Sequence, residues 1–124
     1  MDVAFALGCI KNEHGKLVPL ALETRMASTL YHERSLRRGW DDFRKRVDPK
    51  MDRETIAFTR LSCAIAVREL AGQRYTRSEF ADYAWIVGVR REAFEAAVML
   101  VKSWLDDLCI TGIHALKERM QNAA

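Results

Sequence analysis

The sequence predicts a mainly α-helical fold, a compact bundle of four to five helices with one tight corner between two of them. Three observations support this prediction. Apolar residues recur at helical spacing through most of the chain, capping residues mark helix starts, and glycines mark helix ends. The 124 residues are 49% hydrophobic and 30% charged, which is typical of a single globular domain. We therefore expect residues 1–124 to form one domain.

Residues 1–22 begin this domain with an ambiguous pattern. Two short apolar runs flank a polar break at residues 11–16, which contains Gly15. Two strands joined by a turn at this break would form a short β-hairpin, with Pro19 restricted to an edge strand. The alanine-rich start of the chain is equally compatible with a helix. The segment is therefore expected to be either a hairpin or an arm.

Residues 23–48 are expected to form one long or broken basic helix. Leu30, Leu36, Trp40 and Phe43 recur at helical intervals, and Gly39 is the place where a break would fall. The helix should end before Pro49, because the residue that precedes a proline avoids the α conformation.

The net charge of +3 comes entirely from residues 31–53, where eight basic residues stand against five acidic ones. Arginine dominates and aromatic side chains are interleaved, which suits phosphate binding because a guanidinium can bridge two oxygens. The same pattern is typical of a solvated helix with ion pairs four residues apart, such as Asp41 with Lys45. Both interpretations stay open.

Residues 52–110 carry clear start and stop signals for three further helices. Asp52 is a natural N-cap for a helix that continues to Leu70, where Ala71 and Gly72 end it. Residues 76–79 form a capping box that starts the next helix, which runs to Gly88. The following helix should extend to about Cys109. Residues 111–112 then predict a break before a short C-terminal helix within 113–122.

Residues 80–99 show a spacing with a specific structural meaning. Ala84 is a small residue on the first helix, Gly88 follows at the turn, and Phe94 lies six residues later. A small residue lets two helices cross closely, glycine takes the left-handed turn conformation, and apolar residues fix the crossing angle. The pattern resembles the helix-turn-helix motif. With the preceding helix, residues 55–110 resemble the three-helix core of winged-helix DNA-binding proteins.

This resemblance implies that the second helix of the motif enters the DNA major groove by its N-terminal end. The residues placed there by position are Arg90, Arg91, Glu92 and Glu95. Phosphate contacts would come from the preceding helix and from the basic segment, namely Arg74, Arg77, Arg37, Arg38, Arg44, Lys45 and Arg46. The expected function is that of a small non-enzymatic DNA-binding protein, a transcriptional or accessory regulator.

Three apolar residues support a different interpretation. Trp85, Ile86 and Met99 stand where a DNA-binding motif of this kind usually exposes polar side chains. If the core does not use them, they form an exposed patch that a second chain should cover. The alternative is therefore a protein-interaction adaptor or inhibitor that binds another macromolecule through an apolar and arginine-rich helical surface. In both cases we expect a homodimer.

The sequence has no pattern typical of an enzyme or of a metal or cofactor site. Its three histidines are scattered, and no cysteine or histidine pair has the spacing of metal ligands. Three cysteines within apolar segments indicate buried, reduced thiols. The apolar start lacks the basic residues of a signal peptide, and no window is long enough to cross a bilayer. We therefore expect a cytoplasmic protein with no membrane contact.

Overall fold

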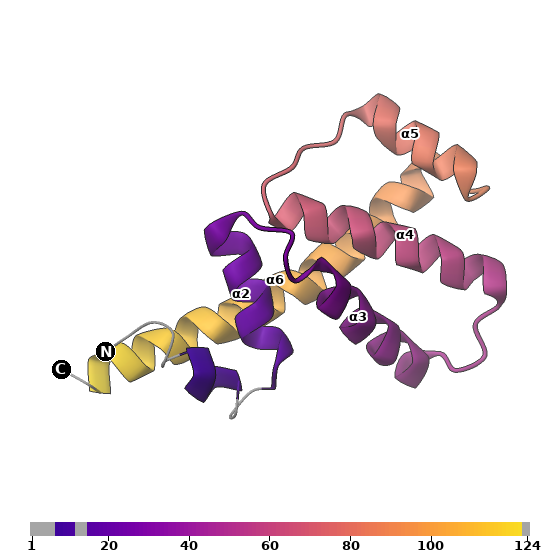
Figure 1. Cartoon of the computed structure of the whole chain (residues 1–124). Helices are drawn as coiled ribbons and strands as arrows, with labels where there is room; N and C mark the ends of the chain where they lie inside the picture. Colours follow the sequence, from indigo (N-terminus) through magenta and orange to yellow (C-terminus); the bar gives the residue numbers. More distant parts are fainter. Residues whose placement is uncertain (1–6, 12–14, 123–124) are drawn as a thin grey trace.

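The computed structural model describes residues 7–11 and 15–122, and these residues are mainly helical, as predicted. A short helical segment at residues 7–11 precedes five helices: α2 (Leu17–Ala27), α3 (Glu33–Val47), α4 (Arg53–Leu70), α5 (Arg77–Ile86) and α6 (Arg91–Asn122) (Figure 1). The N-terminal β-hairpin is a wrong prediction, since the described part of residues 1–22 contains helix and no strand. The rest of that segment, residues 1–6 and 12–14, lies outside the described residues.

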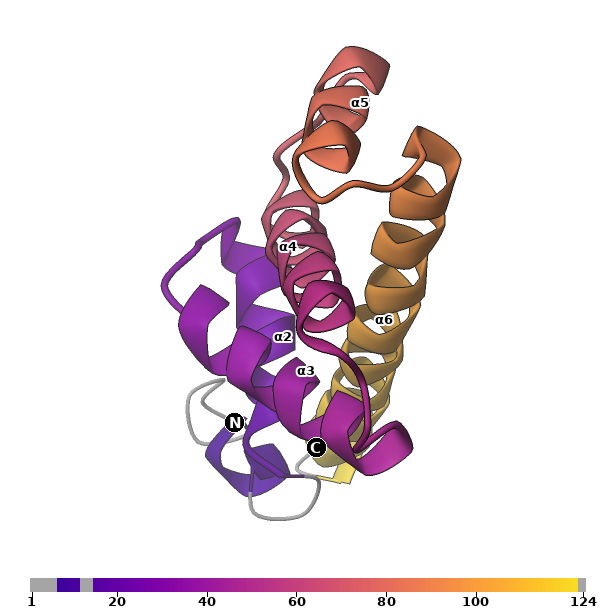
Figure 2. The same cartoon turned by 90° about the vertical axis from the view of Figure 1, so that its right-hand side faces the viewer.

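Helix α6 is the central helix of the fold, and α2, α4 and α5 all pack against it (Figures 1 and 2). Its inner side is a stripe of buried residues three or four positions apart, as expected for one face of a helix. These residues are Phe94, Val98, Val101, Leu105, Cys109, Gly112 and Ala115.

The predicted break at residues 111–112 and the separate C-terminal helix within 113–122 are wrong, because α6 continues without interruption to Asn122. Gly112 is buried against α2, and a Cβ added there would lie 3.2 Å from side-chain atoms of both Val18 and Leu22. The glycine therefore allows two helices to approach closely and does not end a helix.

The basic segment 23–48 is two helices, with the break at residues 28–32. Ser28 caps α2 in the left-handed conformation with a φ of 49°. Gly39, the predicted break point, lies inside α3 against the side chain of Leu17. Helix α3 is anchored by Leu36 and Trp40, and the Trp40 ring lies 5.4 Å from that of Trp104 on α6.

The predicted corner is formed by α5, a turn at residues 87–90 and the start of α6. The predicted capping box is present at its beginning, where Thr76 and Glu79 exchange hydrogen bonds. Gly88 has a φ of +72°, the left-handed conformation expected of it. Ala84 and Phe94 are buried between the helices. The spacing thus predicted the local structure of the corner correctly.

Candidate functional site

At the corner, the two arginines predicted to face DNA have different surroundings. Arg90 is exposed, and its side chain forms no hydrogen bond or ion pair with any described residue. The Arg91 guanidinium lies 3.0 Å from a carboxylate oxygen of Glu92 and 3.5 Å from one of Glu95. A backbone hydrogen bond and the nearby Arg91 charge hold the pKa of Glu92 below its usual range. The charge of Arg91 is thus taken up by two carboxylates, which leaves Arg90 as the available cation of this group.

Four large apolar side chains near the corner are exposed, two at the end of α5 and two on α6. The exposed fractions are 83% for Trp85, 66% for Ile86 and 60% for Met99. Leu100, which the sequence interpretation did not single out, is 65% exposed. We call Trp85, Ile86, Met99 and Leu100 the apolar corner. Arg77, the first residue of α5, and Arg74, three residues before it, are also exposed.

A second candidate surface lies on α3, where the basic residues share the side turned away from Leu36 and Trp40. Figures 1 and 2 place α3 away from α5 in both views, so the structure does not bring this surface together with the corner. Its cations are Arg34, Arg37, Arg38, Lys45 and Arg46, all exposed, with Arg60 contributed by the neighbouring α4. We call these six residues the arginine face.

Arg44 does not belong to this face, although the sequence predicted a phosphate contact there. It is only 5% exposed, and its Nε and Nη2 atoms donate to Asp41 Oδ1 at 3.3 and 3.2 Å. The physical reason is helical register, since Arg44 follows Trp40 by four residues and Leu36 by eight, on the buried stripe. Its guanidinium stabilises the fold and is not available to a ligand.

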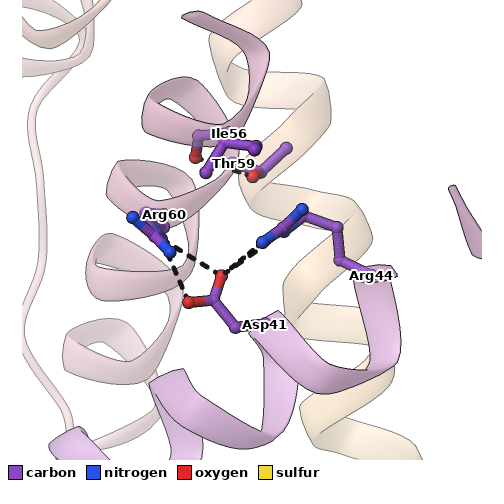
Figure 3. A network of polar contacts seen from close by, with 5 residues as sticks. All are labelled: Asp41, Arg44, Ile56, Thr59 and Arg60. Atoms are coloured by element: carbon purple, nitrogen blue, oxygen red, sulfur yellow. Dashed lines mark hydrogen bonds and ion pairs between the residues drawn. The ribbon is translucent and has the colours of Figure 1, made fainter. Parts of the chain in front are cut away.

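Asp41 connects this buried arginine to the exposed surface. Figure 3 shows its carboxylate between the guanidinium groups of Arg44 and Arg60. The Arg60 Nε donates to both carboxylate oxygens, at 3.0 and 3.3 Å. The contact ties α3 to α4, and the single negative charge of Asp41 is shared between two cations. Arg34 is one of the eight basic residues of the segment 31–53, but neither it nor Arg60 was among the predicted phosphate contacts. Arg34 could have been found from its three- and four-residue spacing to Arg37 and Arg38, whereas only the fold places Arg60 beside Asp41.

Two shallow hollows adjoin each other at Arg38. The first, of about 330 Å³, lies between α3 and α4 and is lined by Arg34, Arg37, Arg38, Asp41, Arg60 and Cys63. The second, of about 550 Å³, is lined by Lys16, Leu17, Ser35, Arg38, Gly39, Asp42, Lys45 and Arg46. Burial raises the pKa of the Cys63 thiol to about 12, so this side chain adds no negative charge at neutral pH. Both hollows are therefore positively charged.

Three arginines of this surface lack the carboxylate partners that four other arginines of the fold have. Arg44, Arg60, Arg68 and Arg91 are each bound to a carboxylate. In contrast, the side chains of Arg34, Arg37 and Arg38 form no hydrogen bond or ion pair with the described residues. Like charges three or four positions apart on a helix repel each other by a few tenths of a kcal/mol, roughly. A bound anion would remove that repulsion.

Comparisons with protein-family models, curated proteins and solved structures gave no match to this chain. Over residues 7–11 and 15–122, no helix combines the length and the apolar character needed to cross a membrane. In the same residues, histidine, cysteine and carboxylate side chains do not gather in groups of three or more that could hold a metal ion. The candidate binding surfaces of the protein are therefore the arginine face and the apolar corner.

Proposed function

We propose that the protein is a small non-enzymatic DNA-binding protein whose arginine face contacts the phosphate backbone. The observation that carries the proposal is the group formed by Arg34, Arg37 and Arg38. These side chains are exposed beside two positively charged hollows and have no carboxylate partner in the part of the chain that the structure describes. Guanidinium groups recognise phosphate oxygens through paired hydrogen bonds, and such contacts supply most of the affinity that does not depend on base sequence.

The dimensions of α3 agree with this role. Arg34 and Lys45 are eleven positions apart, which at a rise of about 1.5 Å per residue corresponds to roughly 16 Å. Along one DNA strand, phosphates follow each other every 3.4 Å of helix axis, approximately, so this length spans about five of them. The side chains of the arginine face can therefore reach several phosphates at once.

The corner contributes less to the proposal than its sequence resemblance implies. Arg91 is already bound to Glu92 and Glu95, and the exposed residues that follow on α6 include Met99 and Leu100. Neither apolar side chain can form the hydrogen bonds that distinguish one base pair from another. We therefore propose backbone binding by α3, and a regulatory role in transcription would require base contacts from Arg90 in addition.

The salt dependence of binding to a DNA duplex of about 20 base pairs tests this proposal. The variant Arg34→Gln/Arg37→Gln/Arg38→Gln removes three cations from α3. The variant Arg74→Gln/Arg77→Gln/Arg90→Gln removes the same charge from the corner and is the matched control. We expect the α3 variant to reduce the log–log salt slope by about 2.7, or about 0.9 for each lost phosphate contact.

Two results would contradict the proposal. If the wild-type protein did not bind the DNA duplex at about 50 mM salt, DNA would be excluded as the ligand. If the corner variant reduced the salt slope and the α3 variant did not, the DNA-contacting surface would be the helix-turn-helix corner and not the arginine face.

The apolar corner favours a second candidate function, the binding of a protein chain. A tryptophan that is 83% exposed beside an isoleucine that is 66% exposed is typical of a surface that another chain covers. A second copy of this chain is the partner to test first. In sedimentation experiments, we expect a mass that rises with protein concentration in the wild type and stays monomeric in Trp85→Glu. A wild type that remains monomeric throughout would exclude the homodimer.

A further inference from the structure

We propose that the hollow between α3 and α4 is a binding site for a multiply charged phosphate group. This chemistry is supplied by the terminal phosphate of a DNA strand or by the diphosphate of a free nucleotide. The inference rests on the proposed DNA binding when the ligand is a strand end, and it then gives the arginine face a preference for ends over internal phosphates.

The shape of the hollow supports a discrete ligand. Four arginines from two helices, Arg34, Arg37, Arg38 and Arg60, line one volume of about 330 Å³. This volume is at the lower end of the range of roughly 300–1,000 Å³ found for small-molecule sites. A row of side chains along one helix would follow a backbone, whereas cations converging from two helices can surround a single anionic group.

Asp41 gives Arg60 a defined position at the edge of this hollow (Figure 3). Only the Nε atom of Arg60 donates to Asp41, so both terminal nitrogens of the guanidinium remain without a hydrogen-bond partner among the described residues. A guanidinium held in this way can offer those nitrogens to two oxygens of one phosphate. Asp41 is thus a positioning residue for Arg60.

The charge of the hollow favours a phosphate monoester or diphosphate over an internal phosphodiester. Among the described residues that line it, Asp41 is the one carboxylate, and it is shared by Arg60 and the buried Arg44. An internal phosphodiester carries one negative charge, whereas a terminal phosphate carries about −1.5 to −2 at neutral pH. Protonated Cys63, whose pKa is raised to about 12 by burial, adds no opposing charge. The more highly charged group therefore matches four arginines better.

Fluorescence anisotropy with one oligonucleotide in two forms, 5′-hydroxyl and 5′-phosphate, tests the inference. We expect the phosphorylated form to bind about tenfold more tightly, the effect of one additional charge-assisted hydrogen bond. Arg34→Gln and Arg60→Gln should each lower the ratio of the two affinities to about one. Asp41→Asn should reduce the ratio as well, with circular dichroism used to verify that the variant is folded.

The matched control is Lys45→Gln/Arg46→Gln, which removes two cations from the arginine face outside the first hollow. It should weaken binding of both oligonucleotides and leave their ratio unchanged. Titration calorimetry of the wild type with ADP then identifies the source of the phosphate. ADP binding that Arg60→Gln abolishes, without an end preference in DNA, would support the site with a free nucleotide as its ligand.

The failure of this inference is distinguishable from the failure of the proposed function. Equal binding of the two oligonucleotides, together with no binding of ADP, would overturn the phosphate site and leave backbone binding intact. No binding of either oligonucleotide would overturn DNA binding itself.

Discussion

Replacement of Phe94 by alanine tests whether one side chain holds the corner to the rest of the fold. Phe94 is completely buried, and its ring centroid lies 6.1 Å from that of Phe58 on α4 and 6.0 Å from that of Phe80 on α5. Tyr83 stacks on it at 6.2 Å. Phe94 thus joins three helices, and its removal opens a cavity between them.

The loss of a buried phenylalanine costs about 3–5 kcal/mol, of which aromatic pairs contribute a part. A domain of this size has a total stability of about 5–15 kcal/mol, so the variant should still fold. In urea denaturation followed by circular dichroism, with an m-value of about 1.5 kcal/mol/M, a loss of about 4 kcal/mol lowers the midpoint by about 2.7 M. Amide hydrogen exchange should accelerate most strongly in α5.

Tyr31→Ala is the control, because Tyr31 is 87% exposed and its loss should change stability by no more than about 0.5 kcal/mol. A Phe94→Ala midpoint within the error of the wild type would refute the packing described for the corner. A large loss of stability with unchanged exchange in α5 would show that Phe94 supports α4 and α6 alone.

Three other changes test separate parts of the structure. Gly112→Leu should lower the free energy of unfolding by about 1–3 kcal/mol in urea denaturation, because the larger side chain forces α6 away from Val18 and Leu22. Unchanged stability would show that α2 and α6 do not pack closely at Gly112. Thr76→Ala should cost about 1 kcal/mol through loss of the N-cap of α5, and an unaltered melting curve would exclude a stabilising capping box. The pKa of Cys63 is raised to about 12 from an ordinary value of 9.0, so folding favours the protonated thiol. The contribution of this thiol to the free energy of unfolding is therefore complete below pH 9. It is lost between pH 9 and 12 at about 1.4 kcal/mol per pH unit. Cys63→Ala should therefore start less stable and decline less steeply above pH 9, whereas parallel curves for the two proteins would rule out this linkage.

Local hydrogen bonding explains which parts of the fold could be predicted from the sequence. Asp52 accepts a hydrogen bond from the amide of Thr55, and Thr76 pairs with Glu79. These partners are three residues apart, so the pattern is visible in the sequence itself. The same holds for Gly88, whose conformation is set by the turn that contains it.

Tertiary packing explains the elements that were predicted wrongly. Gly112 and Gly39 resemble helix ends in the sequence, but each one faces a side chain of α2 and lies within a helix. No local pattern distinguishes a glycine required for close packing from a glycine that ends a helix. The break at Ser28, by contrast, is made by a residue that seldom adopts the left-handed conformation.

The sequence predicted which segment of the chain carries the positive charge, but only partly which of its side chains are exposed. The arginine-rich segment correctly indicated where positive charge gathers, since Arg37, Arg38, Lys45 and Arg46 are exposed on α3. The inward position of Arg44 could have been deduced from its spacing to Leu36 and Trp40. The place of Arg60 could not, because Asp41 is nineteen residues away in the chain.

Mapping the contact surface by nuclear magnetic resonance tests the central claim most directly. When an unlabelled DNA duplex is added to ¹⁵N-labelled protein, we expect the largest shift changes in the amides of residues 34–46 and in the Nε–H group of Arg60. Amides of residues 85–100 should change little. Changes concentrated in residues 85–100, with α3 unaffected, would contradict the assignment of DNA binding to the arginine face.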